Sequence, residues 1–279
     1  MGDWLEIPKI PVGDGAEAVF DWLQTNASGT FDAMADGLTA LIDGLLFAFE
    51  LLPPVVLIAL FAALAWALRR GWRAPVFTAL GLAFILNQGY WDETLESLTL
   101  VLSACVVCMG LGVPIGILAA RRPGLYAGMR PVLDLMQTLP AFVYLIPAIV
   151  FFGIGMVPGL IATVIFVLPA PIRLTHLGIS STPKPLIEAA EAFGATGLQR
   201  LVKIELPHAA PQIMAGLNQT IMLSLSMVVI AALVGADGLG VPVVRALNRV
   251  DTGLGFESGF VIVVLAIVLD RLVRAEGRS

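Results

Sequence analysis

The chain has 279 residues, of which 58% are hydrophobic and only 13% are charged, and its net charge is −5. Soluble domains carry about 25% charged residues, and the mean hydropathy here is +0.92. This composition excludes a disordered chain, a collagen-like chain and a disulfide scaffold, and it leaves too little polar surface for an ordinary soluble enzyme. It predicts an all-α, polytopic membrane protein.

The N-terminal segment, residues 1–50, is acidic and contains one base, Lys9. Its nine acids are Asp3, Glu6, Asp14, Glu17, Asp21, Asp32, Asp36, Asp43 and Glu50. Nothing in it is typical of a signal peptide, which has a basic region, a short apolar core and a small-residue cleavage site. We predict that residues 1–50 are an extracytoplasmic segment and that residues 51–279 form the transmembrane domain.

Residues 31–50 predict an amphipathic helix at the outer interface of the membrane. At 100° per residue one face is apolar, and the other carries carboxylates. Helices that bind anionic cytoplasmic lipid usually carry Lys or Arg instead. Contact with lipid and packing on the protein's own helices both stay open for the apolar face, which consists of Phe31, Met34, Leu38, Leu41, Ile42, Leu45 and Phe49.

Seven apolar runs follow the acidic segment, and most of them approach the 20 or so residues that a membrane span needs. They cover roughly 51–68, 74–90, 95–119, 131–156, 158–174, 208–234 and 256–270. The second run is marginal in length and the last is short. Seven spans place the two ends of the chain on opposite sides of the membrane.

If the chain crosses the membrane seven times, most of its basic residues lie on the same side of the membrane. Thirteen fall on the C-terminal side: Arg69, Arg70, Arg73, Arg121, Arg122, Arg130, Arg173, Lys184, Arg200, Lys203, Arg271, Arg274 and Arg278. Only Lys9, Arg245 and Arg249 fall on the other side. Because cytoplasmic loops collect Lys and Arg, we predict a cytoplasmic C-terminus and an extracytoplasmic N-terminus.

Residues 175–207, called here the 175–207 loop, form the longest polar interruption after the N-terminal segment. Thr182 followed by Pro183 is typical of a helix start. Gly194 suits the left-handed residue that ends a helix. The sequence therefore predicts a short cytoplasmic helix that ends in a tight turn.

A second short helix is predicted after that turn. Thr196 and Gln199 have the spacing of a capping box, and the helix should run to about Glu205 before Pro207 begins the next element. Helices this short are marginal in water and need a docking surface.

The first of these helices has a small apolar face that we expect to form a contact. Ala189, Ala190 and Phe193 supply the apolar groups, and Glu188 lies toward the positive end of the helix dipole. Spacing alone leaves open whether this face packs on the protein's own spans or on a partner.

The 175–207 loop matches a specific motif, E-A-A-x3-G-x9-I-x-L-P, at every fixed position. The matching residues are Glu188, Ala189, Ala190, Gly194, Ile204, Leu206 and Pro207. This is the EAA loop of ABC importer permeases, so the chain resembles that family. The resemblance implies the type I ABC importer permease fold, here with about seven transmembrane helices. It also implies that the loop, with Phe193, docks on an ATPase subunit.

The resemblance is closest to the glycine betaine, proline betaine and choline branch, and it covers roughly residues 90–275. It rests on the 131–180 segment, on the segment around Gly235–Gly240 and on the pair Asp270-Arg271. In the 131–180 segment, the matching positions include Asp134, Gln137, Thr138, Pro140, Phe142, Tyr144, Pro147, Gly153, Gly155, Arg173 and Thr175. One departure is Ala170, which stands where the branch has a second consecutive proline.

The resemblance implies an ATP-driven importer of quaternary ammonium compounds in the cell inner membrane. Two permease copies, expected as a homodimer, would work with two ATPase subunits and an extracytoplasmic substrate-binding protein. The sequence lacks a G-x-x-x-x-G-K-[ST] phosphate loop, so we expect no cofactor in this chain and expect ATP and Mg to bind the partner ATPase.

Import of a different small solute, such as an amino acid or a sulfonate, stays open. The EAA loop argues against a secondary transporter or channel that works without an ATPase. The lack of a catalytic constellation argues against an intramembrane enzyme.

The substrate route is predicted near the 131–156 run, because Pro140 and Pro147 should break or kink it. Broken helices at membrane depth are tolerated where they line a cavity or are buried in protein. The candidate substrate-pathway residues are Gln137, Thr138, Phe142 and Tyr144, whose two rings can face a quaternary ammonium ion. These residues could instead only pack the core of the bundle or dimer.

Three further sets of residues have predicted roles. Candidates for docking the binding protein are Asp237, Arg245, Arg249, Asp251 and Glu257, unless they only form a solvated loop. Asp134 and Arg173 are expected to be interfacial anchors or a structural pair.

Cys105 and Cys108 are interpreted as small buried residues, and Gly112 and Gly116 have the spacing of close helix packing. We find no metal-ligating or catalytic constellation.

A β-branched residue at position 194 tests the predicted cap. Gly194→Val should strain the left-handed turn and uncouple ATP hydrolysis from transport. Uptake and stimulated ATPase activity would be measured in parallel. Unchanged values of both would contradict the prediction.

Overall fold

The computed structural model describes residues 11–69 and 71–273, and within these ranges every regular element is a helix. Asp3, Glu6, Lys9, Arg70, Arg274 and Arg278 from the charge analysis lie outside the described residues. The helices before the 175–207 loop are α1 (Val12–Glu50), α2 (Pro54–Arg69), α3 (Arg73–Asn87), α4 (Trp91–Arg121), α5 (Pro123–Thr138), α6 (Ala141–Phe152), α7 (Met156–Val167) and α8 (Pro169–Ser180). The later ones are α9 (Lys184–Ala192), α10 (Gly197–Arg200), the π-helical turn η1 (Leu201–Glu205), α11 (Leu206–Ala232), α12 (Gly240–Arg249) and α13 (Thr252–Val273).

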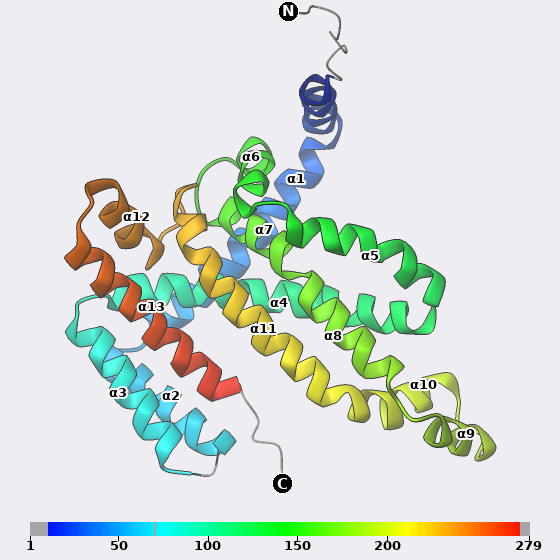
Figure 1. Cartoon of the computed structure of the whole chain (residues 1–279). Coiled ribbons are helices and arrows are strands. Elements are labelled where there is room, and N and C mark those ends of the chain that lie inside the picture. The colour runs from blue at the N-terminus through cyan, green and yellow to red at the C-terminus, as the bar shows by residue number, and fades with distance from the viewer. Residues whose placement is uncertain (1–10, 70, 274–279) are drawn as a thin grey trace, which may run out of the picture.

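Helix α1 contains the predicted amphipathic stretch 31–50 and extends it toward the N-terminus. In that stretch Ile42 is buried in the main core, and the ring of Phe31 stacks on Phe151 of α6 with centroids 4.4 Å apart. These contacts favour packing on the protein's own helices for this part of α1. The N-terminal end of α1 extends beyond the bundle (Figure 1), although Phe20 and Gln24 still contact Phe151 and Val150 of α6.

Four helical stretches are long and apolar enough to cross a membrane, or up to six if each of two bent pairs counts as one span, within the described ranges. The four are Trp91–Arg121, Met156–Ser180, Gly197–Ala232 and Thr252–Val273. Seven runs were predicted. Of these, 51–68 and 131–156 fall within the two bent pairs, and 74–90 falls in α3, which is too short to be counted. Helix α3 has 15 residues, or about 22 Å at 1.5 Å per residue, which is short of a hydrocarbon core of about 30 Å.

The predicted break in the 131–156 run is present at one of its two prolines. Helices α5 and α6 meet at an angle of 95°. Leu139 is extended there (φ −66°, ψ 134°), because a residue that precedes proline avoids the helical conformation. Pro147 lies inside α6, which continues through it.

Helices α4, α8 and α11 form the central contact of the bundle, and in Figure 1 α4 passes behind α8 and α11, which run side by side. The predicted small-residue packing is confirmed on α4. A Cβ atom on Gly116 would lie 2.7 Å from the carbonyl oxygen of Ile172, and one on Gly112 would lie 2.8 Å from Pro171. Only hydrogen at these positions lets α4 approach α8 this closely.

The two cysteines of α4 are buried and free. Cys105 belongs to the main hydrophobic core, and the thiol of Cys108 lies 3.8 Å from the carbonyl oxygen of Val164. This agrees with their interpretation as small packed residues.

Basic groups that are far apart in sequence lie toward one end of the bundle. Arg121 contacts Gly197 and Glu205 in the 175–207 loop. Arg271 lies over the ring of Phe77, 5.4 Å from its centroid, near the start of α3. Figure 1 shows α9, α10, the C-terminal end of α13 and the start of α3 toward this end, called here the loop end, and α12 and α6 toward the other.

A pair of glycines on α4 provides a matched test of the central packing. Gly116→Ala should destabilise the protein by about 1–3 kcal/mol through overpacking against α8, which lowers the melting temperature in detergent. Gly110→Ala lies on the same helix with open space around it. That control should be neutral or slightly stabilising, since alanine favours a helix over glycine. Equal melting temperatures for the two variants would contradict the proposed close contact.

Candidate functional site

The 175–207 loop folds as two short helices joined by a glycine turn, as predicted. Gly194 has φ +74°, the left-handed conformation expected of a residue that ends a helix. Its N–H donates to the carbonyl of Glu191 at 2.9 Å, and the N–H of Ala195 donates to the carbonyl of Ala190 at 3.0 Å. These bonds satisfy the last carbonyls of α9. Gly197 has open space and no positive φ, so Gly197→Val is the matched control for Gly194→Val.

The capping box of the second helix is confirmed. The N–H of Thr196 donates to Oε1 of Gln199 at 2.8 Å, and the N–H of Gln199 donates to Oγ1 of Thr196 at 3.3 Å. The predicted cap of the first helix is wrong, because α9 begins at Lys184 with Pro183 as its N-cap residue. The hydroxyl of Thr182 lies one residue too early, and it is buried with no partner among the described residues.

The predicted boundary is present, because η1 ends at Glu205 and α11 begins at Leu206 with Pro207 in its first turn, but the backbone does not break there. Gly197–Ala232 is one continuous helical stretch of 36 residues. The π-helical turn at Leu201–Glu205 carries the backbone into α11 through a bond from the N–H of Leu206 to the carbonyl of Leu201. Pro207 then lies in the first turn of α11, where its missing N–H costs little. The loop is therefore continuous with a long apolar helix.

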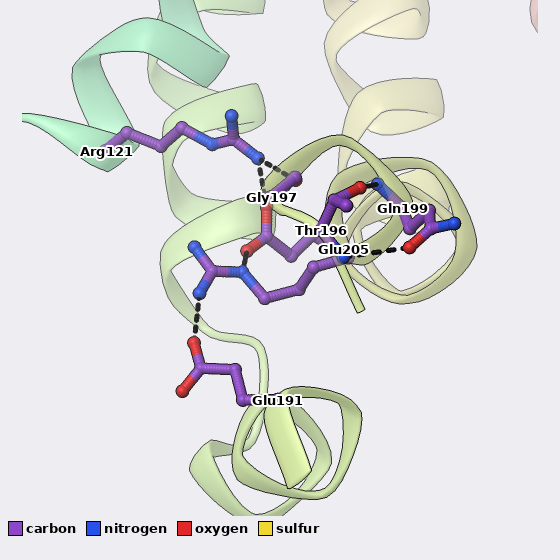
Figure 2. Close-up of polar contacts among 7 residues, drawn as sticks. Arg121, Glu191, Thr196, Gly197, Gln199 and Glu205 are labelled. Carbon is purple, nitrogen blue, oxygen red and sulfur yellow. Dashed lines mark hydrogen bonds and ion pairs between the residues drawn. The ribbon is translucent and has the colours of Figure 1, made fainter. Parts of the chain in front are cut away.

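A buried carboxylate joins the loop to α4, as Figure 2 shows. Glu205 is 4% exposed. Its Oε2 lies 3.3 Å from Nη2 of Arg121, and its Oε1 accepts a 2.8 Å hydrogen bond from Nε of Arg200. Arg121 also donates to the carbonyl of Gly197 at 3.0 Å. Arg200 reaches Glu191 of α9 at 2.5 Å.

These ion pairs fix three elements relative to one another: the end of α4, α9 and the α10–η1 stretch. A carboxylate removed from water is costly unless it is paired and hydrogen-bonded, and charge-assisted bonds of this kind are the stronger ones. The Glu205 network is the part of the site that sequence reasoning missed. Arg121 and Glu205 are 84 residues apart, so no local spacing signals the pair.

The predicted coupling residues divide between the two sides of the loop. Ala190 is buried, and Ile204 and Leu206 are half-buried. Glu188, Ala189, Gly194 and Pro207 are exposed, and Phe193 is 93% exposed. The expected single apolar face is therefore split, with Ala190 packed inward. Phe193 and Leu198, which is 69% exposed, both present apolar side chains to solvent.

The candidate substrate-pathway residues differ in how far they are buried. The ring of Tyr144 is buried in a second core cluster, and its hydroxyl donates to the carbonyl of Leu135 at 3.3 Å. Phe142 is 55% exposed. Gln137 is half-buried and Thr138 is exposed. The two rings therefore differ in their access to solvent.

The predicted docking residues Asp237, Arg245, Arg249, Asp251 and Glu257 are all exposed, at the end of the bundle that carries α12. Asp251 has a structural contact too, because its Oδ1 accepts the N–H of Leu254 at 3.0 Å at the start of α13. Asp134 and Arg173 form a 2.6 Å ion pair between α5 and α8, so the structural pair is confirmed.

Comparison with known proteins places this geometry in a family context. Residues 112–276 match the family described as "Binding-protein-dependent transport system inner membrane component". The chain is 49% identical to the glycine betaine transport system permease protein OpuAB of Bacillus subtilis, over 96% of this chain and 95% of the relative. It is 45% identical to the glycine betaine/carnitine transport permease protein GbuB of Listeria monocytogenes, over 96% of each chain.

Further similarities agree with these. The chain is 45% identical to the glycine betaine/proline betaine transport system permease protein ProW of Escherichia coli, over 97% of this chain and 76% of the relative. A solved structure of the MetNI methionine ABC transporter in an inward-facing conformation matches with a TM-score of 0.58 and 24% identity, over 66% of this chain and 94% of that one. The fold is therefore that of a type I ABC importer permease.

Removing the charge of Glu205 tests whether the network holds the loop. Glu205→Gln should weaken the bonds to Arg121 and Arg200 by about 1.5–3 kcal/mol, so backbone amides of residues 184–205 should exchange with deuterium at least tenfold faster. Glu188→Gln is the matched control, since Glu188 is exposed on the same loop. Equal exchange in both variants would show that the loop does not depend on the network.

Proposed function

Because the chain belongs to the family of binding-protein-dependent transport system inner membrane components, we propose that it is the membrane-spanning subunit of an ATP-driven importer for quaternary ammonium compounds. Glycine betaine, carnitine and proline betaine, the solutes in the names of its relatives, all carry a quaternary ammonium group. The observation that supports this most is 49% identity to a glycine betaine permease over nearly the whole of both chains.

The 175–207 loop is the proposed contact with the ATPase subunit. Phe193 and Leu198 present apolar groups to solvent at the loop end, and aromatic side chains are typical anchors of protein interfaces. ATP and Mg would bind that separate subunit, so ATP hydrolysis is assigned to the partner and not to this chain.

The proposed mechanism is alternating access driven through this contact. Closure of two ATPase subunits on ATP would displace the exposed side of α9. The Glu205 network passes that displacement to α4, and the continuous Gly197–Ala232 stretch passes it to α11. Caps at Gly194 and Thr196 keep the short helices rigid enough to act as levers. The bundle then opens outward to receive solute.

The proposed importer also requires a second permease copy and a binding protein. A second copy of this permease completes the pathway as a homodimer. An extracytoplasmic binding protein delivers the solute to the α12 end, where Asp237, Arg245, Arg249, Asp251 and Glu257 are exposed. This orientation puts α1 outside the cell and the loop end in the cytoplasm, in agreement with the basic residues gathered there.

Reconstitution tests the proposal directly. The permease, its copurifying ATPase and its binding protein would be placed in proteoliposomes, and uptake of radiolabelled glycine betaine would be measured. Uptake should require ATP and the binding protein. Uptake driven by an ion gradient alone would contradict the ATP-driven mechanism, and uptake of only an amino acid or a sulfonate would contradict the solute class.

Loss of the exposed ring tests the ATPase contact. Phe193→Ala should lower copurification of the ATPase at least tenfold, since truncating an aromatic interface anchor costs about 2 kcal/mol or more. Phe256→Ala is the control, because Phe256 is 77% exposed near the opposite end of the bundle. Equal recovery of the ATPase with both variants would remove Phe193 from the interface.

A further inference from the structure

The segment between α11 and α12, residues 233–239, is buried among other elements and is called here the 233–239 connection. Val234, Ala236 and Leu239 are buried, while Asp237, one of the proposed docking residues, is exposed between them. Connections normally run over the surface, because their backbone polar groups need water or another partner. The buried part of this connection therefore depends on bonds to the elements around it.

Two hydrogen bonds attach the connection to its neighbours. The N–H of Leu239 donates to Oγ of Ser97 on α4 at 2.8 Å, and both residues are fully buried. The N–H of Gly155, at the start of α7, donates to the carbonyl oxygen of Val234 at 2.9 Å. Because a buried N–H without a partner is costly, the Ser97 hydroxyl fixes the place where the connection meets α4.

Glycines let the backbone approach α4 and α11 closely at this place. A Cβ atom on Gly238 would lie 2.4 Å from Oγ of Ser97, and one on Gly240 would lie 2.3 Å from the carbonyl oxygen of Val228 on α11. Gly238 also has φ +116°, a conformation that residues with a side chain rarely adopt. The start of α12 is therefore wedged between α4 and α11, with the Ser97 bond at the centre of the contact.

Helix α4 carries the Glu205 network at its other end. It is continuous from Trp91 to Arg121, and about 36 Å of helix separates Ser97 from Arg121. One helix thus contacts the connection that carries Asp237 at one end and the 175–207 loop at the other. This arrangement gives α4 a part in both of the proposed subunit contacts.

We propose that Ser97 is a positioning residue through which the docked binding protein activates the ATPase. The inference rests on the proposed function and adds a residue that belongs to neither the docking set nor the coupling set. Ser97 fastens the connection and α12 to α4, so a displacement of Asp237 by the binding protein moves the end of α4 as well. Arg121 passes that movement to Glu205 and the loop.

Ser97→Ala tests this role in proteoliposomes that contain the permease and its copurifying ATPase. ATP hydrolysis would be measured with and without the binding protein loaded with glycine betaine. The variant leaves the N–H of Leu239 without its acceptor, so stimulation, the ratio of the two rates, should fall about tenfold. The rate without binding protein should stay as in the unmodified protein, because the Glu205 network is intact.

Two further variants complete the set. Ser103→Ala is the matched control, since Ser103 is equally buried on α4 but its hydroxyl has no partner among the described residues. Its stimulation should be unchanged. Ser97→Cys keeps nearly the same size, so it should fold even if Ser97→Ala does not. Its sulfur is only a weak acceptor, so its stimulation should lie between those of Ser97→Ala and the unmodified protein.

Two results would overturn the proposal. One is unchanged stimulation in both Ser97 variants. The other is an equal loss of both rates in Ser97→Cys, because a purely structural role would lower hydrolysis with and without binding protein alike. Failure of the proposed function looks different, since the unmodified transporter would then show neither stimulation by the binding protein nor ATP-dependent uptake of glycine betaine.

Discussion

The ion pairs of one buried carboxylate hold the working parts of this protein together. Glu205 lies where the 175–207 loop enters α11, and it binds Arg121 from α4 and Arg200 from its own turn. Arg200 in turn reaches Glu191 on α9. Without these partners the carboxylate would be buried at a cost of several kcal/mol, so the loop, α4 and α11 are held in one arrangement. The short helices, which are marginal alone, acquire their rigidity from this network and from their caps.

That rigidity explains why a polar loop in an apolar chain is built from helices. A flexible connection would absorb a displacement at α9, whereas a capped helix joined to two long helices transmits it.

Local sequence signals predicted much of this structure. The Gly194 turn, the Thr196–Gln199 capping box and the glycine packing on α4 follow from short-range spacing, and each is present. Contacts between distant residues were not predictable in this way. The Arg121–Glu205 pair has no local signature, and Tyr144, which spacing placed at the substrate route, is buried against its own core. The π-helical turn that carries the backbone into α11 without a break has no signature in residue types either.

In the proposed mechanism the Glu205 network couples the loop to the membrane helices. Its most direct test is the number of ATP molecules hydrolysed per glycine betaine imported, measured in proteoliposomes for Glu205→Gln and for the unmodified protein. This ratio should rise severalfold in the variant, because ATPase motion is no longer passed to α4 and α11. An unchanged ratio, with the variant incorporated at the same level, would contradict it.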